Sequence, residues 1–299
     1  MEHETKKKIE TVCVACGRKE HVFYTKKNGH DVWRCLFCKT LFLYPLPKSS
    51  ETEAVYGKEY FAGGKEGFGY VDYDADKEAM RAVFEKYLTD FVRILGKTGR
   101  LLDIGAATGY FMRIAETKGW KVHGIEISAY AAELGKSRGL DIETGTVHQT
   151  TFAKESFDLV TMWDVVEHMP DPILDIKKIR TLIKPNGLVA INTPDSGSLF
   201  ARILGSRWHL FVPPEHIFYF NRNSLRMLLE RNGFEVLEVG CVGKRFTVEY
   251  IMHTLSRWQN LGIWKKLLGF LERHPRIGQW SLPVNLWDNM YMLARKVEK

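Results

Sequence analysis

Residues 101–126 read LLDIGAATGYFMRIAETKGWKVHGIE, and this stretch decides the fold. Its apolar start, 101–104, predicts the end of a buried strand, and the glycines at 105 and 109 predict a tight turn. Residues 110–118 have apolar side chains at helical spacing, and 120–125 predict a second strand that ends at Glu126. An acid 17 residues beyond Gly109 is close to the spacing that holds ribose hydroxyls. The stretch therefore predicts a βαβ unit that binds a nucleoside-type cofactor.

The residues of the turn distinguish between cofactors. A dinucleotide site uses G-x-G-x-x-G, which places a pyrophosphate on a helix N-terminus. Here three residues separate Gly105 from Gly109, and the preceding Asp103 would repel a pyrophosphate but suits a cationic ligand. The pattern resembles motif I, D-x-G-x-G-x-G, of class I S-adenosylmethionine-dependent methyltransferases. Ala107 replaces the middle glycine, which permits close approach of the cofactor if its φ is negative. The alternatives are a generic α/β turn or an eroded nicotinamide site.

Later segments agree with this resemblance. Residues 156–163 predict a third buried strand that resembles the family's FDLV strand, and the loop at 164–172 carries the E-H pair of many small-molecule methyltransferases. Further predicted elements are helices at 173–182 and 224–232 and strands at 188–194 and near 289–296. The resemblance covers about 75–240 and the last strand. It implies an α/β fold with a Rossmann-like seven-stranded methyltransferase sheet, helices on both faces and a small zinc ribbon in front.

The same resemblance implies a set of cofactor-binding residues. Asp103 would take the positive end of the methionine moiety, and Glu126 would accept both ribose hydroxyls. The implied residues are Asp103, Gly105, Ala106, Gly109, Tyr110, Glu126, Ile127 and Trp163. Relatives usually have an acid for the adenine amino group, but 145–147 read GTV. Adenine recognition would therefore fall to backbone groups and apolar walls.

Four cysteines form the second signal. Cys13 and Cys16 make one C-x2-C pair, Cys35 and Cys38 make another, and 18 residues separate the pairs. This is zinc-ribbon spacing, in which two turns offer four thiolates to one tetrahedral ion. No signal peptide precedes the pairs, which favours a reducing, cytoplasmic compartment and zinc over disulfides or a redox pair. Four thiolates leave no open coordination site, so the zinc is predicted to be structural. Cys241 is predicted to be a core residue.

Three regions are predicted along the chain. Residues 1–45 would form the zinc ribbon, 46–95 a linker and an N-terminal lid helix that starts near residue 76, and 96–299 the methyltransferase domain. A basic, Trp-rich insertion at about 244–287 would interrupt that domain. In the family, a segment such as 46–95 often lies over the cofactor. Its aromatic residues would equally serve only to pack the helix on the core.

The candidates for acceptor chemistry are His168 and His216. The sulfonium methyl group is already activated, so the enzyme must align an acceptor and exclude water. Either histidine could be the catalytic base or a hydrogen-bonded structural residue. Asp164, Glu167 and His168 have the spacing of the E-x-x-E-H run that is proposed to hold a divalent ion in ubiquinone-type O-methyltransferases. Alternatively, His168 orients the substrate, or Glu167 and His168 cap the following helix.

The acceptor class rests on resemblance. The ribbon, the core, and Trp208 followed by PEHIFYF at 214–220 resemble bacterial methyltransferases that modify small molecules. This implies a sugar, a nucleotide-sugar of surface polysaccharide synthesis or a lipid-linked precursor as acceptor. The alternative is an RNA methyltransferase, since a ribbon and a basic tail suit RNA. Against a nucleic-acid partner, an N/D-P-P-[FY] motif is missing and charges outside the tail are balanced. The near-complete motif set disfavours a non-catalytic scaffold.

The C-terminal tail concentrates positive charge. The chain of 299 residues has a net charge of +7, and residues 244–299 hold ten Lys or Arg against four Asp or Glu. A helix there would place apolar side chains on one face and Lys265 and Lys266 off it. The apolar residues are Ile263, Trp264, Leu267, Leu268 and Leu271. That face could make peripheral contact with an anionic membrane, cap the acceptor pocket or form a homodimer. The sequence contains no apolar run long enough to span a membrane.

Overall fold

A computed structural model describes residues 9–47, 57–61, 73–248, 252, 262–278 and 280–298. Its central layer is a seven-stranded sheet of order β10-β13-β8-β7-β4-β5-β6. Five strands pair in parallel, and β13 pairs antiparallel with both of its neighbours. The bounds are β4 (Arg100–Ile104), β5 (Lys121–Glu126), β6 (Ile142–Thr144), β7 (Phe157–Trp163), β8 (Ile183–Pro194), β10 (Phe234–Cys241) and β13 (Asn289–Lys296). The predicted seven-stranded Rossmann-like sheet is confirmed.

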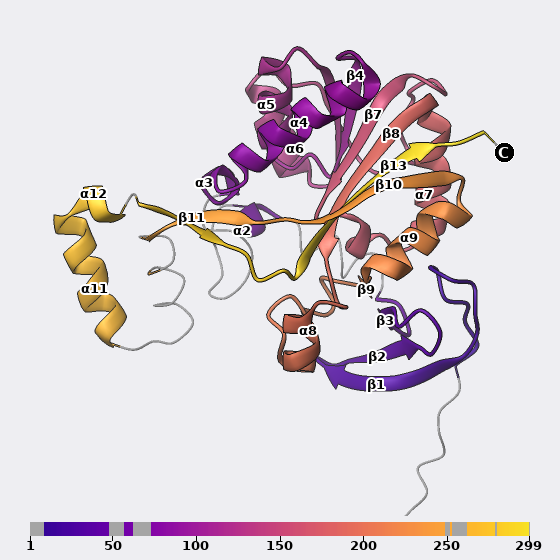
Figure 1. Ribbon diagram of the computed structural model, residues 1–299, viewed down its shortest axis with the longest axis horizontal. Helices are drawn as coiled ribbons and strands as arrows, with labels where there is room; N and C mark the ends of the chain where they lie inside the picture. Colours follow the sequence, from indigo (N-terminus) through magenta and orange to yellow (C-terminus); the bar gives the residue numbers. More distant parts are fainter. Residues whose placement is uncertain are drawn as a thin grey trace, which may run out of the picture.

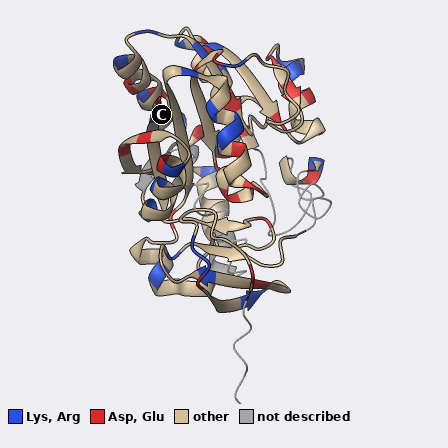
Figure 2. Ribbon diagram, turned by 90° about the vertical axis from the view of Figure 1, so that its right-hand side faces the viewer, with Lys and Arg blue, Asp and Glu red and all other residues tan. Residues whose placement is uncertain are grey.

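Helices cover both faces of this sheet (Figure 1). On one face lie α4 (Arg81–Leu95), α5 (Tyr110–Thr117) and α6 (Ala129–Ser137), and on the other α7 (Pro172–Leu182) and α9 (Arg222–Arg231). All seven residues of β7 are buried, as a parallel strand covered on both faces requires. Figure 2 shows Lys and Arg interspersed with Asp and Glu along the flanking helices, as the balanced charge outside the tail predicts.

Two local expectations need correction. The single helix expected over 76–95 is two helices, because α3 (Tyr73–Glu78) ends before α4 begins, and Met80 precedes α4 without a side-chain cap. Ala107 has φ +49°, so the condition of a negative φ, on which close approach of the cofactor was predicted, is not met. The turn needs the left-handed backbone that a glycine adopts freely, so Ala107 is held there by its surroundings at a steric cost. The Glu126 carboxylate accepts its backbone N–H at 2.7 Å and helps to hold it.

The cysteine-bearing segment does not close its own sheet. Strands β1 (His21–Lys27), β2 (His30–Cys35) and β3 (Leu41–Leu43) form an antiparallel meander, and β9 (Phe218–Tyr219) pairs with β3 as its fourth strand. Buried residues of the ribbon and of the α7–α9 face belong to one hydrophobic cluster. The predicted boundary at residue 45 remains a prediction, but the ribbon sheet is completed by a strand nearly 180 residues downstream.

The insertion between β10 and β13 forms an arm at the side of the molecule (Figure 1). Strands β11 (Lys244–Thr247) and β12 (Ser281–Val284) pair, and α11 (Gly262–Arg273) and α12 (Pro275–Gly278) lie between them in the chain. The helix expected around 263–271 is present, with Leu271 6% and Leu267 39% exposed. The side chains of 263–266 and the loop at 62–72 lie outside the described residues. Among the helices that the structure describes, none has the length and apolar character to cross a bilayer.

Candidate active site

A cavity of about 700 Å³ opens at the carboxyl ends of the parallel strands. At one end its lining includes the turn after β4 and the last residue of β5, Glu126. At the other end it includes His168, His209 and His216. Ligands of open α/β sheets bind at this edge of the strands. The predicted cofactor turn and the predicted acceptor histidines therefore share one cavity.

Glu126 organises the cofactor end. Its side chain is 5% exposed and accepts the backbone N–H of Ala107 at 2.7 Å and that of Ser128 at 2.8 Å. Burial raises the pKa of this carboxyl. The two bonds join the β4 turn to the start of α6, so Glu126 both lines the cavity and shapes its wall.

The glycines of the turn leave no room for side chains. A Cβ on Gly105 would lie 2.4 Å from Val165 Cγ2, and one on Gly109 would lie 2.0 Å from Leu140 Cδ1. Both residues have positive φ, +72° and +78°. Space and backbone conformation thus require glycine at these two positions.

The predicted cofactor residues divide into two groups. Gly105, Glu126, Ile127 and Trp163 line the cavity, whereas Asp103, Ala106, Gly109 and Tyr110 do not. All four residues of the second group are buried.

Asp103 and Tyr110 have partners of their own. Asp103 is 1% exposed and accepts the Thr161 hydroxyl at 2.7 Å, and burial raises its pKa to about 7. The Tyr110 hydroxyl donates to Glu78 of α3. Asp103 and Tyr110 therefore support the turn from behind rather than facing the cavity.

Sequence reasoning missed Lys77 and Asp175. Lys77 of α3 is 6% exposed, and its Nζ lies 3.0 Å from Asp164 Oδ2. The segment predicted as a lid therefore contributes the side chain of Lys77 to the cavity lining. Asp175 of α7 also lines the cavity, beside Gly145–Val147, and pairs with His148 at 2.7 Å. An acid thus stands at the wall where the expected one is absent. Neither residue belongs to a sequence motif, and only the fold brings them here.

The two predicted catalytic histidines are neighbours, with ring centroids 4.8 Å apart. His168 Nδ1 donates to the Glu215 carbonyl at 2.6 Å, and His216 Nδ1 donates to the Leu210 carbonyl at 2.9 Å. These bonds make Nε2 the unprotonated nitrogen of each neutral ring. Burial lowers the pKa of His168, and it lowers that of His216 to about 3. Both rings are therefore neutral at ordinary pH.

Glu167 lies beside this pair. It is 1% exposed; Oε2 accepts the Thr193 hydroxyl at 2.8 Å, whereas Oε1 is buried without a hydrogen-bond partner. Burial, with the Asp164 charge adding to it, raises the pKa of Glu167 to about 8. Ligand atoms of Glu167, His168 and His216 lie within 4.8 Å of one another. Asp164, predicted as a third ion ligand, is instead held by Lys77 and by Asn192 Nδ2 at 2.8 Å.

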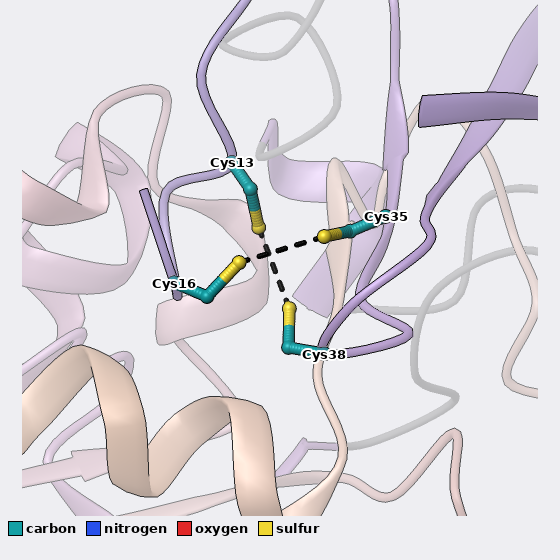
Figure 3. A group of neighbouring side chains, drawn as sticks. All are labelled: Cys13, Cys16, Cys35 and Cys38. Carbon is teal, nitrogen blue, oxygen red and sulfur yellow. Dashed lines mark hydrogen bonds between the residues drawn. The ribbon is translucent and has the colours of Figure 1, made fainter. Parts of the chain in front are cut away.

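The four predicted zinc ligands converge (Figure 3). Cys13 Sγ lies 3.5 Å from Cys38 Sγ, and Cys16 Sγ lies 3.5 Å from Cys35 Sγ. Four thiolates at ~2.3 Å from one tetrahedral ion would be separated by about 3.8 Å, so the group fits zinc. The hydrogen bond between the thiols of Cys13 and Cys38 lowers the pKa of Cys38 and raises that of Cys13, so it favours one thiolate in the pair. Cys241 lies apart from them, half-buried at the end of β10 rather than in the core.

A family profile described as a methyltransferase domain matches residues 76–239, more than half of the chain. The chain belongs to this methyltransferase family. The enzyme class predicted from the sequence, an S-adenosylmethionine-dependent methyltransferase, is confirmed.

Named relatives agree on the class. The methyltransferase is 27% identical over 204 residues to the ubiquinone biosynthesis O-methyltransferase of Saccharophagus degradans. The aligned residues cover 60% of this chain and 84% of that protein. It is 27% identical over 186 residues to the Acinetobacter baumannii protein of that name, 52% of this chain and 77% of that one. The solved YcgJ protein of Bacillus subtilis superposes with a TM-score of 0.50 at 14% identity, over 72% of this chain and 99% of its own. This likeness shows the fold.

Proposed function

We propose that this methyltransferase acts on a small-molecule acceptor that binds at the histidine end of the cavity. The observation that carries the proposal is the continuity of the cavity from Gly105 and Glu126 to His168 and His216. Its volume of about 700 Å³ lies within the range of sites for small ligands. A donor and an acceptor can therefore meet inside one cavity.

The turn and Glu126 fit S-adenosylmethionine, which supplies a methyl group activated by a sulfonium. Glu126 at the tip of β5 would hold the ribose hydroxyls, and Gly105 would offer its backbone to the ligand. Ile127 and Trp163 offer apolar wall. Because Asp103 does not line the cavity, we propose that its charge acts on the methionine end across the turn.

The acceptor end supplies orientation and a base. A buried neutral imidazole whose Nδ1–H is held by a carbonyl can accept a proton at Nε2. We therefore propose that His216 or His168 takes the proton of an acceptor hydroxyl as that oxygen attacks the methyl group. The ubiquinone O-methyltransferases to which the chain is similar support an oxygen acceptor. The proposed acceptors are a sugar, a nucleotide-sugar or a lipid-linked precursor.

A second candidate role for this end is to hold a divalent ion. Glu167 Oε1 is a buried carboxylate oxygen without a partner, and two imidazoles stand beside it. The ligand set differs from the predicted one, because His216 takes the place of Asp164. An ion at these side chains would polarise an acceptor oxygen in place of a histidine base. The four cysteines are proposed to hold one structural zinc that takes no direct part in this chemistry.

The acceptor can be identified by incubating the enzyme and labelled S-adenosylmethionine with fractionated extracts. We expect the label in a small hydroxyl-bearing or lipid-linked compound. The mass of that compound should increase by about 14 Da, because a methyl group replaces a hydrogen atom. A matched incubation with total RNA tests the alternative acceptor. Label in RNA and in none of the small-molecule fractions would overturn the proposal. Dialysis against a chelator, followed by single-metal addition, then separates the histidine base from the ion.

A further inference from the structure

A short helix near the acceptor end presents an apolar face to solvent. In α8 (Leu199–Leu204), Leu199 and Ile203 are each 72% exposed. They are four residues apart and therefore lie on one face of the helix. The opposite side packs on a cluster that contains Trp208 and Phe211, so α8 is anchored while its outer face is uncovered.

A second exposed apolar segment is joined to the residues that follow α8. Leu286 is 43% exposed and Trp287 is 64% exposed. The next residue, Asp288, accepts the indole N–H of Trp208 at 2.8 Å, and its carbonyl accepts the N–H of Asp195 at 2.8 Å. We call the exposed residues Leu199, Ile203, Leu286 and Trp287 the apolar rim.

The rim stands beside the acceptor end of the cavity. His209, Leu210 and Val212, which follow α8 in the chain, line that cavity, and so does Asn289, two residues after Trp287. A surface that covered the rim would therefore lie close to the point at which an acceptor reaches the histidines.

The charge around the rim is positive. Residues 196–214 contain Arg202 and Arg207 and no Asp or Glu, and both arginines are exposed. Exposed leucine, isoleucine and tryptophan among arginines are the composition that binds the interface of an anionic membrane.

We propose that the apolar rim docks on the surface of an anionic bilayer, and that the acceptor is a lipid-linked molecule presented from that surface. Leu199, Ile203 and Trp287 would enter the headgroup region, and Arg202 and Arg207 would meet lipid phosphates. The docking itself follows from the rim alone. The identity of the acceptor rests on the proposed function.

The test is flotation of the full chain with vesicles of phosphatidylcholine, with and without phosphatidylglycerol. We expect binding to the anionic vesicles that weakens as salt rises, because exposed charges are screened. The double variant Leu199→Glu/Ile203→Glu should bind at least ten-fold more weakly. The control Leu237→Glu replaces an exposed leucine of β10 and should bind as the wild type does.

Affinity for S-adenosylhomocysteine shows whether each variant is folded, since the rim lies outside the cofactor end. Wild-type protein that fails to float at low salt would overturn the proposal, as would equal binding by the double variant. A dimer that the double variant dissociates, without flotation, would assign the rim to a second copy instead. If the protein binds anionic vesicles but methylates a soluble acceptor, only the lipid-linked substrate is refuted. Label in RNA alone would refute the proposed function and leave the docking result standing.

Discussion

The two ends of the cavity are built in different ways. The centre of the cofactor end, its turn and its acidic strand tip, comes from one stretch, 104–127, and is fixed by local spacing. The acceptor end is assembled from Tyr60, Glu167–His168 and 209–216, which are far apart in the chain. The first end follows from a motif, and the second depends on packing between distant segments.

The ribbon is part of that packing. Asn28 Nδ2 donates to the Pro213 carbonyl at 2.8 Å, and the N–H of Leu43 donates to the Ile217 carbonyl at 3.0 Å. After β9, Asn221 Nδ2 donates to the Cys38 carbonyl at 2.8 Å. The segment that carries His216 is therefore held at three places by the cysteine-bearing region. Loss of the ribbon should disturb the acceptor end and spare the cofactor end.

The largest effect is expected for His168→Asn, because a pKa of about 3 makes His216 the weaker base of the pair. Removing a general base lowers turnover by roughly 10²- to 10⁴-fold, while affinity for S-adenosylhomocysteine should stay within a few-fold of the wild type. Turnover kinetics and calorimetry on one preparation measure both. His209→Asn is the matched control, since it removes a lining imidazole outside the His168–His216 pair. Equal losses in the two variants would mean that the pair has no special role.

Asp103→Asn tests charge at the cofactor end. Because the folded pKa of about 7 lies above the unfolded value, the folded state binds more protons between about pH 4 and 7. Stability of the ligand-free wild type should therefore fall as pH rises through that window. The neutral variant should lack this fall and be about 2–4 kcal/mol more stable at pH 8. Denaturant unfolding at several pH values measures the difference, and parallel curves for both proteins would contradict the assignment.

Cys35→Ser separates the two ends directly. The variant should lose its zinc. Its turnover should fall roughly 100-fold, which is about 2.7 kcal/mol of activation free energy, because β9 and His216 lose their support. Affinity for S-adenosylhomocysteine should change less than three-fold, or about 0.7 kcal/mol. Metal analysis, kinetics and calorimetry report the three quantities, with Cys241→Ser as control. A parallel loss of cofactor affinity would show that the ends are one unit.

Glu126→Ala acts on the other end. The substitution removes the proposed acceptor for the ribose hydroxyls and the anchor of the Ala107 and Ser128 amides. The expected cost is about 1.5–3 kcal/mol, which is roughly a 10- to 150-fold loss of affinity for S-adenosylhomocysteine. Calorimetry measures it, and Glu126→Gln should lose less because it retains one acceptor oxygen. Unchanged binding would remove Glu126 from the site.

The sequence predicts each end of the cavity to a different extent. The strands, the glycine turn and Glu126 were foreseeable, because period, spacing and residue type are local properties. The φ of Ala107 was not, since burial and the bond to Glu126 impose it. The pairing of β9 with β3, the reach of Lys77 and the approach of His216 to Glu167 join residues that share no motif. The sequence predicted the two histidines as candidates, but it did not predict that their rings lie side by side next to Glu167.

The smallest expected effect concerns α3, a helix of the predicted lid segment that contacts the turn at the cofactor end. Asp74 of α3 accepts Thr108 of the turn, and its Oδ2 lies 2.7 Å from Arg113 and from Arg138. These half-exposed ion pairs are each worth about 0.2–1 kcal/mol.

Asp74→Asn should therefore weaken S-adenosylhomocysteine binding by about five-fold, or 1 kcal/mol, with turnover at saturating cofactor nearly unchanged. Asp90→Asn is matched, because Asp90 of α4 also pairs with two cations and is 21% exposed against 23% for Asp74. If both variants weaken binding equally, general destabilisation explains the loss. If only Asp74→Asn weakens binding, the contact between α3 and the turn after β4 supports cofactor binding.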